Sequence, residues 1–535
     1  MRHLFAALLL AGATLPMPAL ARTDPIEERS IDDLQASMAS GQATSVSLTQ
    51  AYLARIAAME RSNGKKGGPS LRAVIAVNPD ALAQARALDV ERKAGHVRGA
   101  LHGVPVLIKD NIETLDPMAT TAGSLALRGN ITRRDAPVVA QLRAAGAVIL
   151  GKTNLSEWAN IRSTRSMSGW SAVGGLVRNP YALDRTACGS SSGSGAAVAA
   201  SFAAAAVGTE TDGSVVCPSS INGVVGLKPS IGLVSRTRVV PISHSQDTPG
   251  PMARSVRDVA ILLDAMDATD PADPATMERP QYRVAPRPYA ERLSASALSG
   301  MRVGVIRPEM APDLAQQFQA ALDVLKAAGA TLVEVTPPKA PGLGEAELVV
   351  LQTELKADLN AYLATTPPAV TTRTLADVIA FNRAHAATEM PFFDQETFEA
   401  AEKTGGLADP AYKAARAKSL RMAGPEGIDA MLARANVSVL VEPTYGPAWL
   451  SDTVYGDSYG GPSASELPAI AGYPNLTVPM GLVRGLPVGL SFIAGKYAEA
   501  TVLGAGYAYE QRSHARVAPQ YLPTANALPA LEAAR

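Results

Sequence analysis

The fold is decided by residues 303–335, which read VGVI at 303–306, a helical pattern near 311–328 and TLVEV at 331–335. Two short apolar strands joined by a helix of this length form a βαβ unit, in which the strands lie parallel in one sheet. The same alternation of short apolar runs and helical patterns continues on both sides of this unit. It predicts an α/β protein, a three-layer α/β/α sandwich around a large mixed, mostly parallel twisted sheet.

Further elements are expected along the whole chain. Strands are predicted at 74–77, 104–109, 147–150, 437–441, 476–478 and 488–492. Helices are predicted at about 45–61, 79–94, 135–145 and 499–513, and throughout most of 343–435. A tightly packed buried helix is predicted at 193–206, which is almost all Ala, Gly, Ser and Val, and a Pro/Ala-rich connection near 268–300. Residues 22–535 are expected to form a single domain.

Composition and charge exclude several classes of protein. The 535 residues include 49 Lys and Arg and 49 Asp and Glu, so the formal net charge is zero. This balance, together with the absence of basic runs, argues against nucleic acid as a partner. Hydrophobic residues make up 47% of the chain, which is too large a share for a disordered protein. A chain of this length can bury a large core without a disulfide or a structural metal.

The first 21 residues have the pattern of a secretory signal. Arg2 and His3 precede an apolar run at 4–10, and the segment ends in Ala-Leu-Ala at 19–21. The run is interrupted by Gly and Pro and is shorter than the roughly 20 residues that a membrane span needs. We therefore expect cleavage after Ala21, export to the periplasm or the medium, and no membrane span in the mature chain.

The chain has only two cysteines, Cys188 and Cys217. An exported protein can carry one disulfide, but two buried thiols explain the pair equally well. Two cysteines without nearby histidines make a poor zinc site, so no metal is expected.

Two motif matches do not fit their surroundings. GAVILGKT at 146–153 has the P-loop spacing, but its four central residues form an apolar strand and a helix precedes the first glycine. GSSSG at 189–193 has the spacing of a nucleophile elbow, but the preceding residues 179–186 form a polar loop where that elbow needs a strand. None of the six histidines lies in a catalytic sequence context. Nucleotide binding and a Ser-His-Asp triad are therefore disfavoured.

Two clusters rich in serine and glycine point to different chemistry. They read CGSSSGSG at 188–195 and GTETDGS at 208–214. Upstream, Lys109 ends an apolar strand, and burial there would lower its pKa and let it act as a base. A serine hydroxyl needs an adjacent base, and Ser-Lys enzymes supply one without histidine. The alternative is that Ser and Gly here only allow close helix packing.

Beyond these residues, the sequence resembles the amidase signature family over about 30–515. The resemblance rests on the two clusters and on five further motifs: GALHGVPVLIKDN at 99–111, GKTNLSE at 151–157, GVVGLKPS at 223–230, DTPGPMAR at 247–254 and PNLTVP at 474–479. Within the family, CGSSSGS and GTETDGS are most similar to bacterial peptide amidases. The resemblance implies the amidase signature fold and amide hydrolysis without a cofactor.

The family's site residues carry over to matching positions. The resemblance implies Ser214 as nucleophile, Ser190 after a cis peptide bond as bridge, Lys109 as base and Ser191 in a supporting role. It implies an oxyanion hole of the backbone N–H groups of Thr211, Asp212, Gly213 and Ser214. The family often has Gly at the positions of Cys188, Ser192 and Asp212, and Arg at that of Val216. These departures affect the expected substrate preference more than the chemistry.

Three functions are compared on this basis. The first is ammonia release from primary amides, in particular the C-terminal amides of peptides, which export would suit. The second is hydrolysis of aryl, aliphatic or fatty amides, and the third is an exported binding protein without catalysis. An amidotransferase component is disfavoured because a signal peptide would separate it from cytoplasmic partners. Aromatic residues at 445, 449, 455 and 459 could line the acyl pocket or form a surface loop. The sequence indicates no oligomeric state.

Overall fold

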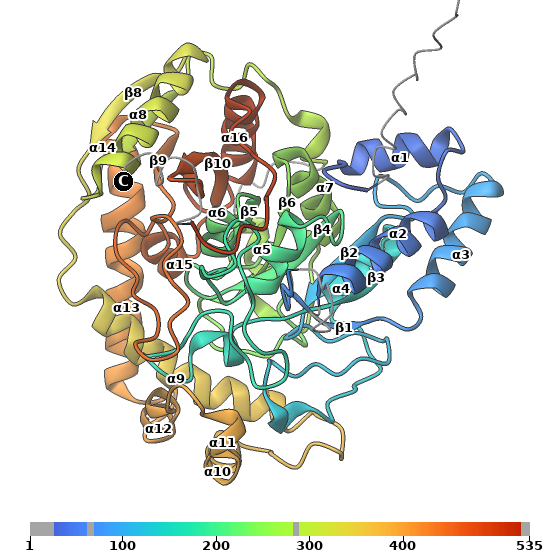
Figure 1. Cartoon of the computed structure of the whole chain (residues 1–535). Helices are drawn as coiled ribbons and strands as arrows, with labels where there is room; N and C mark the ends of the chain where they lie inside the picture. Colours follow the sequence, from blue (N-terminus) through green and yellow to red (C-terminus); the bar gives the residue numbers. More distant parts are fainter. Residues whose placement is uncertain (1–25, 61–68, 282–287, 526–535) are drawn as a thin grey trace, which may run out of the picture.

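The computed structural model describes residues 26–60, 69–281 and 288–525, so the expected signal sequence lies outside the described residues. An 11-stranded sheet runs through the molecule, from β1 in the blue part of the chain to β8 in the yellow part (Figure 1). The strands are β1 Val74–Val77, β2 Pro105–Lys109, β3 Val148–Thr153, β4 Ala205–Glu210, β5 Val225–Lys228, β6 Thr248–Ala253, β7 Arg302–Ile306, β8 Thr331–Val335, β9 Val439–Pro443, β10 Asn475–Val483 and β11 Leu486–Ile493. Their order in the sheet is β1-β3-β2-β4-β6-β5-β10-β11-β9-β7-β8.

The α/β class and the mixed sheet are confirmed, but the expected parallel majority is wrong. Strand β2 pairs in parallel with β3 and β4, and β7 pairs in parallel with β8 and β9. The other six pairings are antiparallel. Strands β10 and β11 are joined by a two-residue turn, Arg484-Gly485, in which both residues have positive φ. Such a turn imposes an antiparallel pair. The parallel βαβ regions therefore flank an antiparallel centre.

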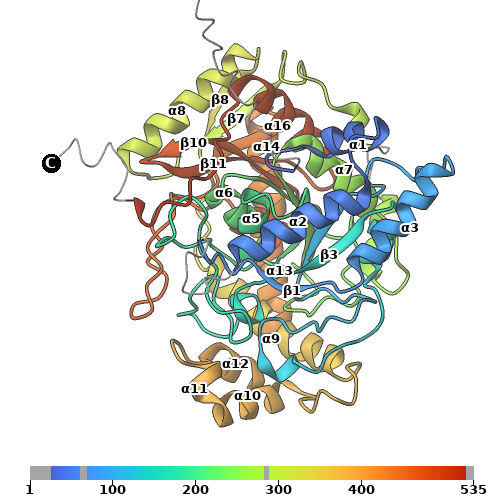
Figure 2. The ribbon, with the colours of Figure 1, turned by 45° about the vertical axis from the view of Figure 1, so that its right-hand side comes forward.

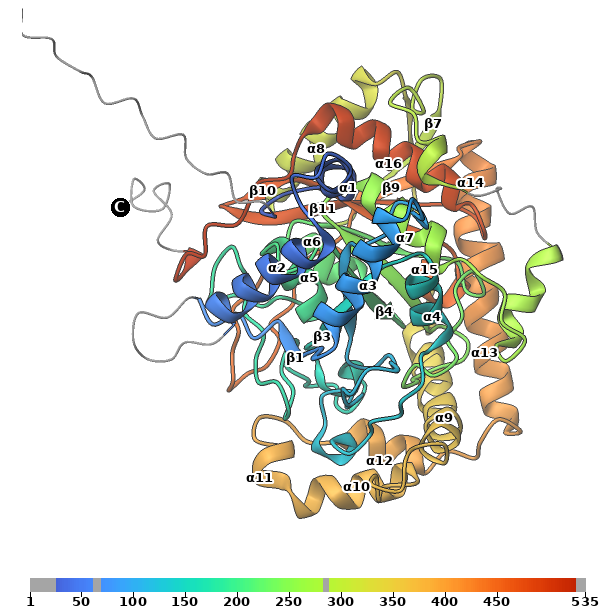
Figure 3. The same ribbon diagram turned by 90° about the vertical axis from the view of Figure 1, so that its right-hand side faces the viewer.

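Helices cover both faces of the sheet. Helices α5 Ser192–Ala199 and α6 Val216–Ile221 pack on β4 and β10, respectively. Helices α7 Val256–Met266, α8 Pro312–Ala327 and α16 Glu499–Ser513 pack on the opposite face, and Figure 3 shows α8 and α16 on the other side of β10 and β11 from α6. The end of the sheet that the N-terminal part of the chain forms is covered by four helices, α1 Ile31–Ala39, α2 Ser45–Met59, α3 Ala81–Lys93 and α4 Pro137–Ala144. None of the described helices has the length and apolar character that a membrane crossing requires.

The helical stretch predicted for 343–435 is confirmed. It contains α9 Leu343–Leu363, α10 Leu375–Ala384, α11 Ala386–Glu389, α12 Glu396–Glu402, α13 Pro410–Ala423, a π-helix Gly424–Ile428 and α14 Asp429–Ala435, and α15 Glu466–Ala471 follows β9. Helices α10, α11 and α12 lie at the lower edge of the molecule, away from the sheet (Figure 2). They pack with α9 around Leu359, Val378 and Phe398.

The prediction of a buried helix at 193–206 is correct for the first part of this range and wrong for the rest. Helix α5 ends at Ala199, Ser201 adopts φ +55°, and β4 begins at Ala205. All residues of α5 and of β4 are buried. A run that is buried on every side has no periodicity to separate helix from strand, which explains the error. The expected connection near 268–300 contains the short 3-10 helices Pro274–Gln281 and Ala290–Arg292, and 282–287 lie outside the described residues.

Candidate active site

The site lies where β2 and β4 end. Because these strands are parallel neighbours, their carboxyl ends meet at one edge of the sheet, where α/β proteins bind ligands. Lys109 is the last residue of β2, and the turn 211–215 leads from β4 to α6. Ser190 lies just before α5, which packs against the same strands. The topology thus brings together three segments that are far apart in sequence.

Lys109 is fully buried and its amine contacts only neutral groups. Its Nζ donates to Ser190 Oγ at 2.8 Å, to Thr209 Oγ1 at 2.9 Å and to the Thr209 carbonyl at 3.2 Å. Among the described residues, no carboxylate forms an ion pair with it. Burial lowers the pKa of Lys109 to about 7, although the charges of Asp247 and Glu210 act in the opposite direction. A large fraction of the amine is therefore neutral at neutral pH and can accept a proton.

Ser190 is held in place by its backbone as well as by Lys109. The peptide bond between Gly189 and Ser190 is cis, as the family resemblance implies. The Ser190 carbonyl accepts from the N–H of Ser156 at 3.0 Å. A Cβ on Gly189 would lie 2.1 Å from Ser156 Oγ, so only glycine fits before the buried serine. The Ser190 hydroxyl is thereby kept against the amine.

Ser214 opens into a cavity next to this pair. The cavity has a volume of about 330 Å³, and Gly189, Thr211, Asp212 and Ser214 are among its lining residues. The Ser214 carbonyl accepts from the N–H of Ser191 at 3.1 Å. Ser191 Oγ in turn donates to the Thr209 carbonyl at 3.0 Å. Ser191 therefore ties the first serine cluster to the second, which suits a supporting role.

The turn before α6 presents unpaired backbone donors. Within the described chain, the N–H groups of residues 211–214 have no hydrogen-bond acceptor, whereas those of Val215 and Val216 donate to Glu210 Oε2 at 2.7 and 3.0 Å. Gly213 has φ +76°, and a Cβ there would lie 2.4 Å from the Tyr445 hydroxyl. Donors arranged in this way can stabilise an oxyanion.

The departure at Asp212 places a carboxyl near these donors, beside a second buried carboxyl. Burial raises the pKa of Asp212, with Ser465 and Lys228 acting in the opposite direction. Burial and the neighbouring Asp212 also raise the pKa of Glu347, on α9, to about 9. Two such carboxyls rarely ionise together at neutral pH. Because the charge of Asp212 helps to raise the pKa of Glu347, the proton that the pair retains lies on Glu347.

The structure decides the state of the two cysteines. Cys188 and Cys217 form a disulfide across a sequence separation of 29, and both line the cavity. The bridge joins the segment before Ser190 to helix α6, just after Ser214. The sequence left this open because only the fold brings α6 beside the first serine cluster.

Aromatic side chains form one wall of the cavity. Tyr445, Trp449 and Tyr459 line it, and the ring of Tyr459 lies 5.6 Å from each of the other two. Tyr455 is 85% exposed and does not line the cavity. Three of the four aromatic residues therefore line the pocket, as one sequence interpretation expected, and Tyr455 lies at the surface, as the other did. Asp457 also lines the wall, where it accepts from Trp449 Nε1 at 2.9 Å and from the Ser168 N–H at 3.0 Å.

Sequence reasoning missed part of this lining. Ile161, Ile242 and Leu351 face the cavity from three distant segments, and no local pattern marks them. The rejected motifs behave as expected. The P-loop-like match ends in strand β3, and none of the described histidines lines the cavity.

Comparison with known proteins agrees with this geometry. The amidase family model matches residues 47–503. The chain belongs to the amidase family. It is therefore an enzyme that acts on amide C–N bonds. A probable amidase of Arabidopsis thaliana is 37% identical over 525 residues, covering 96% of each chain. A glutamyl-tRNA(Gln) amidotransferase component from Thermosynechococcus vestitus is 36% identical, covering 90% of this chain and 97% of its own.

Solved structures of this amidase's relatives include bacterial peptide amidases. The native peptide amidase of Stenotrophomonas maltophilia is 51% identical, with a TM-score of 0.86, and the match covers 93% of this chain and 99% of that one. A peptide amidase in complex with the competitive inhibitor chymostatin is also 51% identical, with a TM-score of 0.88 over 93% of this chain and all of the other. The amidase signature fold expected from the sequence is confirmed.

Proposed function

We propose that this amidase hydrolyses primary amides, in particular the C-terminal amides of peptides, with Ser214 as nucleophile, Ser190 as bridge and Lys109 as base. The observation that carries the proposal is the buried Lys109 amine, which is hydrogen-bonded to Ser190 and has no carboxylate partner among the described residues. An amine in this setting can take a proton near neutral pH, which a serine nucleophile without histidine requires.

The proposed reaction moves one proton along the three side chains. Neutral Lys109 takes the Ser190 proton while Ser190 takes that of Ser214, and Ser214 Oγ attacks the amide carbonyl. The N–H groups of residues 211–214 stabilise the oxyanion, each such donor being worth about 2.7–4 kcal/mol in the transition state. The proton returns to the leaving nitrogen, ammonia departs, and Ser214 carries the acyl group as an ester. Water then hydrolyses this ester by the same relay.

Two observations support peptide amides as substrates. Peptide amidases of known structure are 51% identical to this chain, and one of them binds chymostatin as a competitive inhibitor. The cavity, at about 330 Å³, has the size of a small-ligand site, and its aromatic wall suits an apolar side chain next to the amide. The same wall also favours aryl or fatty amides as a second candidate class.

We further propose that the enzyme is exported, on the basis of the signal pattern at 1–21. N-terminal sequencing of protein recovered from the periplasm or the medium should begin at Arg22. An uncleaved chain retained in the cytoplasm would contradict export.

A substrate panel tests the proposed reaction. Ammonia release is measured from peptide amides, from the same peptides as free acids and from aliphatic primary amides, and aniline release from acyl anilides. We expect the highest kcat/KM for peptide amides and none of this turnover with Ser214→Ala. Full activity in that variant would exclude Ser214 as nucleophile, and higher kcat/KM for anilides would favour the second substrate class.

A further inference from the structure

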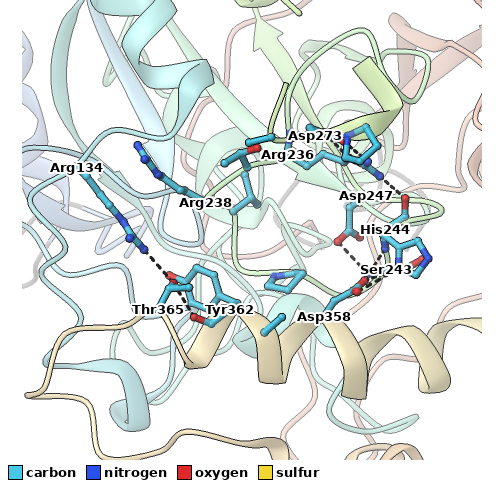
Figure 4. Close-up of a pocket in the computed structure, with 16 residues that line it drawn as sticks. Arg134, Arg236, Arg238, Ser243, His244, Asp247, Asp273, Asp358, Tyr362 and Thr365 are labelled. Carbon is cyan, nitrogen blue, oxygen red and sulfur yellow. Dashed lines mark hydrogen bonds and ion pairs between the residues drawn. The ribbon is translucent and has the colours of Figure 1, made fainter. Parts of the chain in front are cut away.

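A second, larger cavity lies next to the active site and is not used by the proposed reaction. It has a volume of about 530 Å³ and is bounded by residues 236–247, by 272–274 and by α9 (Figure 4). Ser214 and the oxyanion turn do not line it. Figure 4 shows the carboxylate of Asp247 beside the backbone of Ser243, close to Arg236. Asp247 is the part of this wall that contacts Thr211 in the oxyanion turn.

A small cavity lies between this wall and Thr209, which contacts the Lys109 amine. Its volume of about 10 Å³ is close to that of one water molecule, and Asn111, Thr209, Thr211 and Asp247 line it. Thr209 Oγ1 accepts from Lys109 Nζ and, at 2.9 Å, from Asn111 Nδ2. Asn111 is 3% exposed, and its Oδ1 has no hydrogen-bond partner within the described chain. Asp247 and Thr209, which accepts from the amine, therefore border the same small cavity.

Asp247 also supports the oxyanion turn. One carboxylate oxygen accepts from Thr211 Oγ1 at 2.6 Å. The other accepts from the N–H groups of Ile242 and Ser243, at 2.8 and 2.9 Å. Asp247 lines both the small and the large cavity, and it is 9% exposed. It is thus fixed at one end of the oxyanion turn while it stays in contact with the second cavity.

The charges around Asp247 and Lys109 come from few groups. Arg236 borders both cavities, and its guanidinium is held by Asp273. On α9, Asp358 faces the large cavity and pairs with the ring of His244. On the side of the amine, Glu210 is the other carboxyl whose charge acts on Lys109.

We propose that Asp247 is a positioning residue for amide hydrolysis: its carboxylate holds Thr211 in the oxyanion turn and favours the protonated form of Lys109, and the second cavity gives solvent protons access to it. This inference rests on the proposed role of Lys109. Burial raises the pKa of Asp247 to about 6 and lowers that of Lys109 to about 7, so the two groups titrate over the same pH range. The acid limb of the activity profile then depends on both.

The test is the pH dependence of kcat/KM in Asp247→Asn. The amide can still accept from Ile242 and Ser243 and can donate to Thr211 Oγ1, so the local contacts are retained. Loss of the negative charge lowers the pKa of Lys109, and we expect the acid limb to move to lower pH by about one unit. The matched control is Asp358→Asn. It also removes a carboxylate from the large cavity, but Asp358 does not line the small cavity. Its acid limb should stay at the wild-type position.

Asp247→Glu keeps the charge and should return the acid limb to within about 0.3 unit of wild type, with a reduced kcat because Thr211 is displaced. If Asp247→Asn does not fold, Asp247→Glu carries the test, and a limb displaced to lower pH would contradict the inference. A purely structural role for Asp247 would lower kcat in Asp247→Asn without moving the limb, and would overturn it. If the wild type shows no labelling of Ser214 by a fluorophosphonate, the proposed function fails instead. The two failures are therefore distinguishable.

Discussion

The charge state of Lys109 predicts a steep fall in activity at acid pH. Burial depresses the pKa of this amine to about 7, and only the neutral form can accept the Ser190 proton. For a single group titrating at about 7, roughly nine-tenths of the amine is neutral at pH 8, about a tenth at pH 6 and about a hundredth at pH 5. The structure therefore predicts that kcat/KM falls roughly tenfold between pH 8 and pH 6 and falls further, but less steeply than for a single group, below pH 6, where Asp247 becomes protonated.

The assay is ammonia release from a peptide amide at substrate concentrations well below KM, because kcat/KM reports the pKa values of the free enzyme. Enzyme held at pH 5 and returned to pH 8 before the assay controls for irreversible loss of structure. A rate that is flat from pH 5 to pH 9, or an acid limb near pH 4, would show that a carboxyl or no titrating group limits the reaction. Either result would refute the reasoning from the buried amine.

Three further predictions follow from contacts around the cavity. Gly213→Ala places a Cβ 2.4 Å from the Tyr445 hydroxyl at φ +76°, so it should lower kcat by roughly 10²–10³ through misplaced oxyanion donors, as steady-state kinetics would show. Replacing Cys188 and Cys217 together by Ala should lower the free energy of unfolding by about 2–4 kcal/mol in denaturant titrations; an unchanged midpoint would argue against the bridge. Asp457→Ala releases the aromatic wall and should raise KM for peptide amides about tenfold with little change in kcat; equal losses in kcat would contradict a binding role.

Much of the fold could be predicted because its local patterns agree with its tertiary structure. The βαβ unit at 303–335 and the final helix at 499–513 are found nearly where the sequence placed them. Strand β6 was missed because TPGPMA carries two prolines, which local rules exclude from an interior strand, yet it pairs on both sides with β4 and β5. Pairing direction was also misjudged, because it depends on partners that are distant in sequence.

The candidate site was predictable for a related reason. Lys109 stood out as a charge on an apolar strand, and the serine clusters stood out by composition, so the residues that the structure gathers were named from local signals. The role of each came from the family resemblance. Asp247 begins the DTPGPMAR motif but received no role from it, and Ile242 lies in a loop of ordinary composition; only the packing of this segment against the oxyanion turn and the cavity gives them a place beside the site. The disulfide was undecided for the same reason.

The most direct test of the central claim is intact-mass measurement after incubation with a fluorophosphonate, with the adduct mapped by peptide sequencing. The account predicts one adduct, on Ser214, that forms rapidly at pH 8 in the wild type and very slowly in Lys109→Ala. It predicts no adduct on Ser214→Ala. An adduct on another residue, or equal labelling rates in the wild type and in Lys109→Ala, would contradict the claim that a buried neutral lysine activates Ser214.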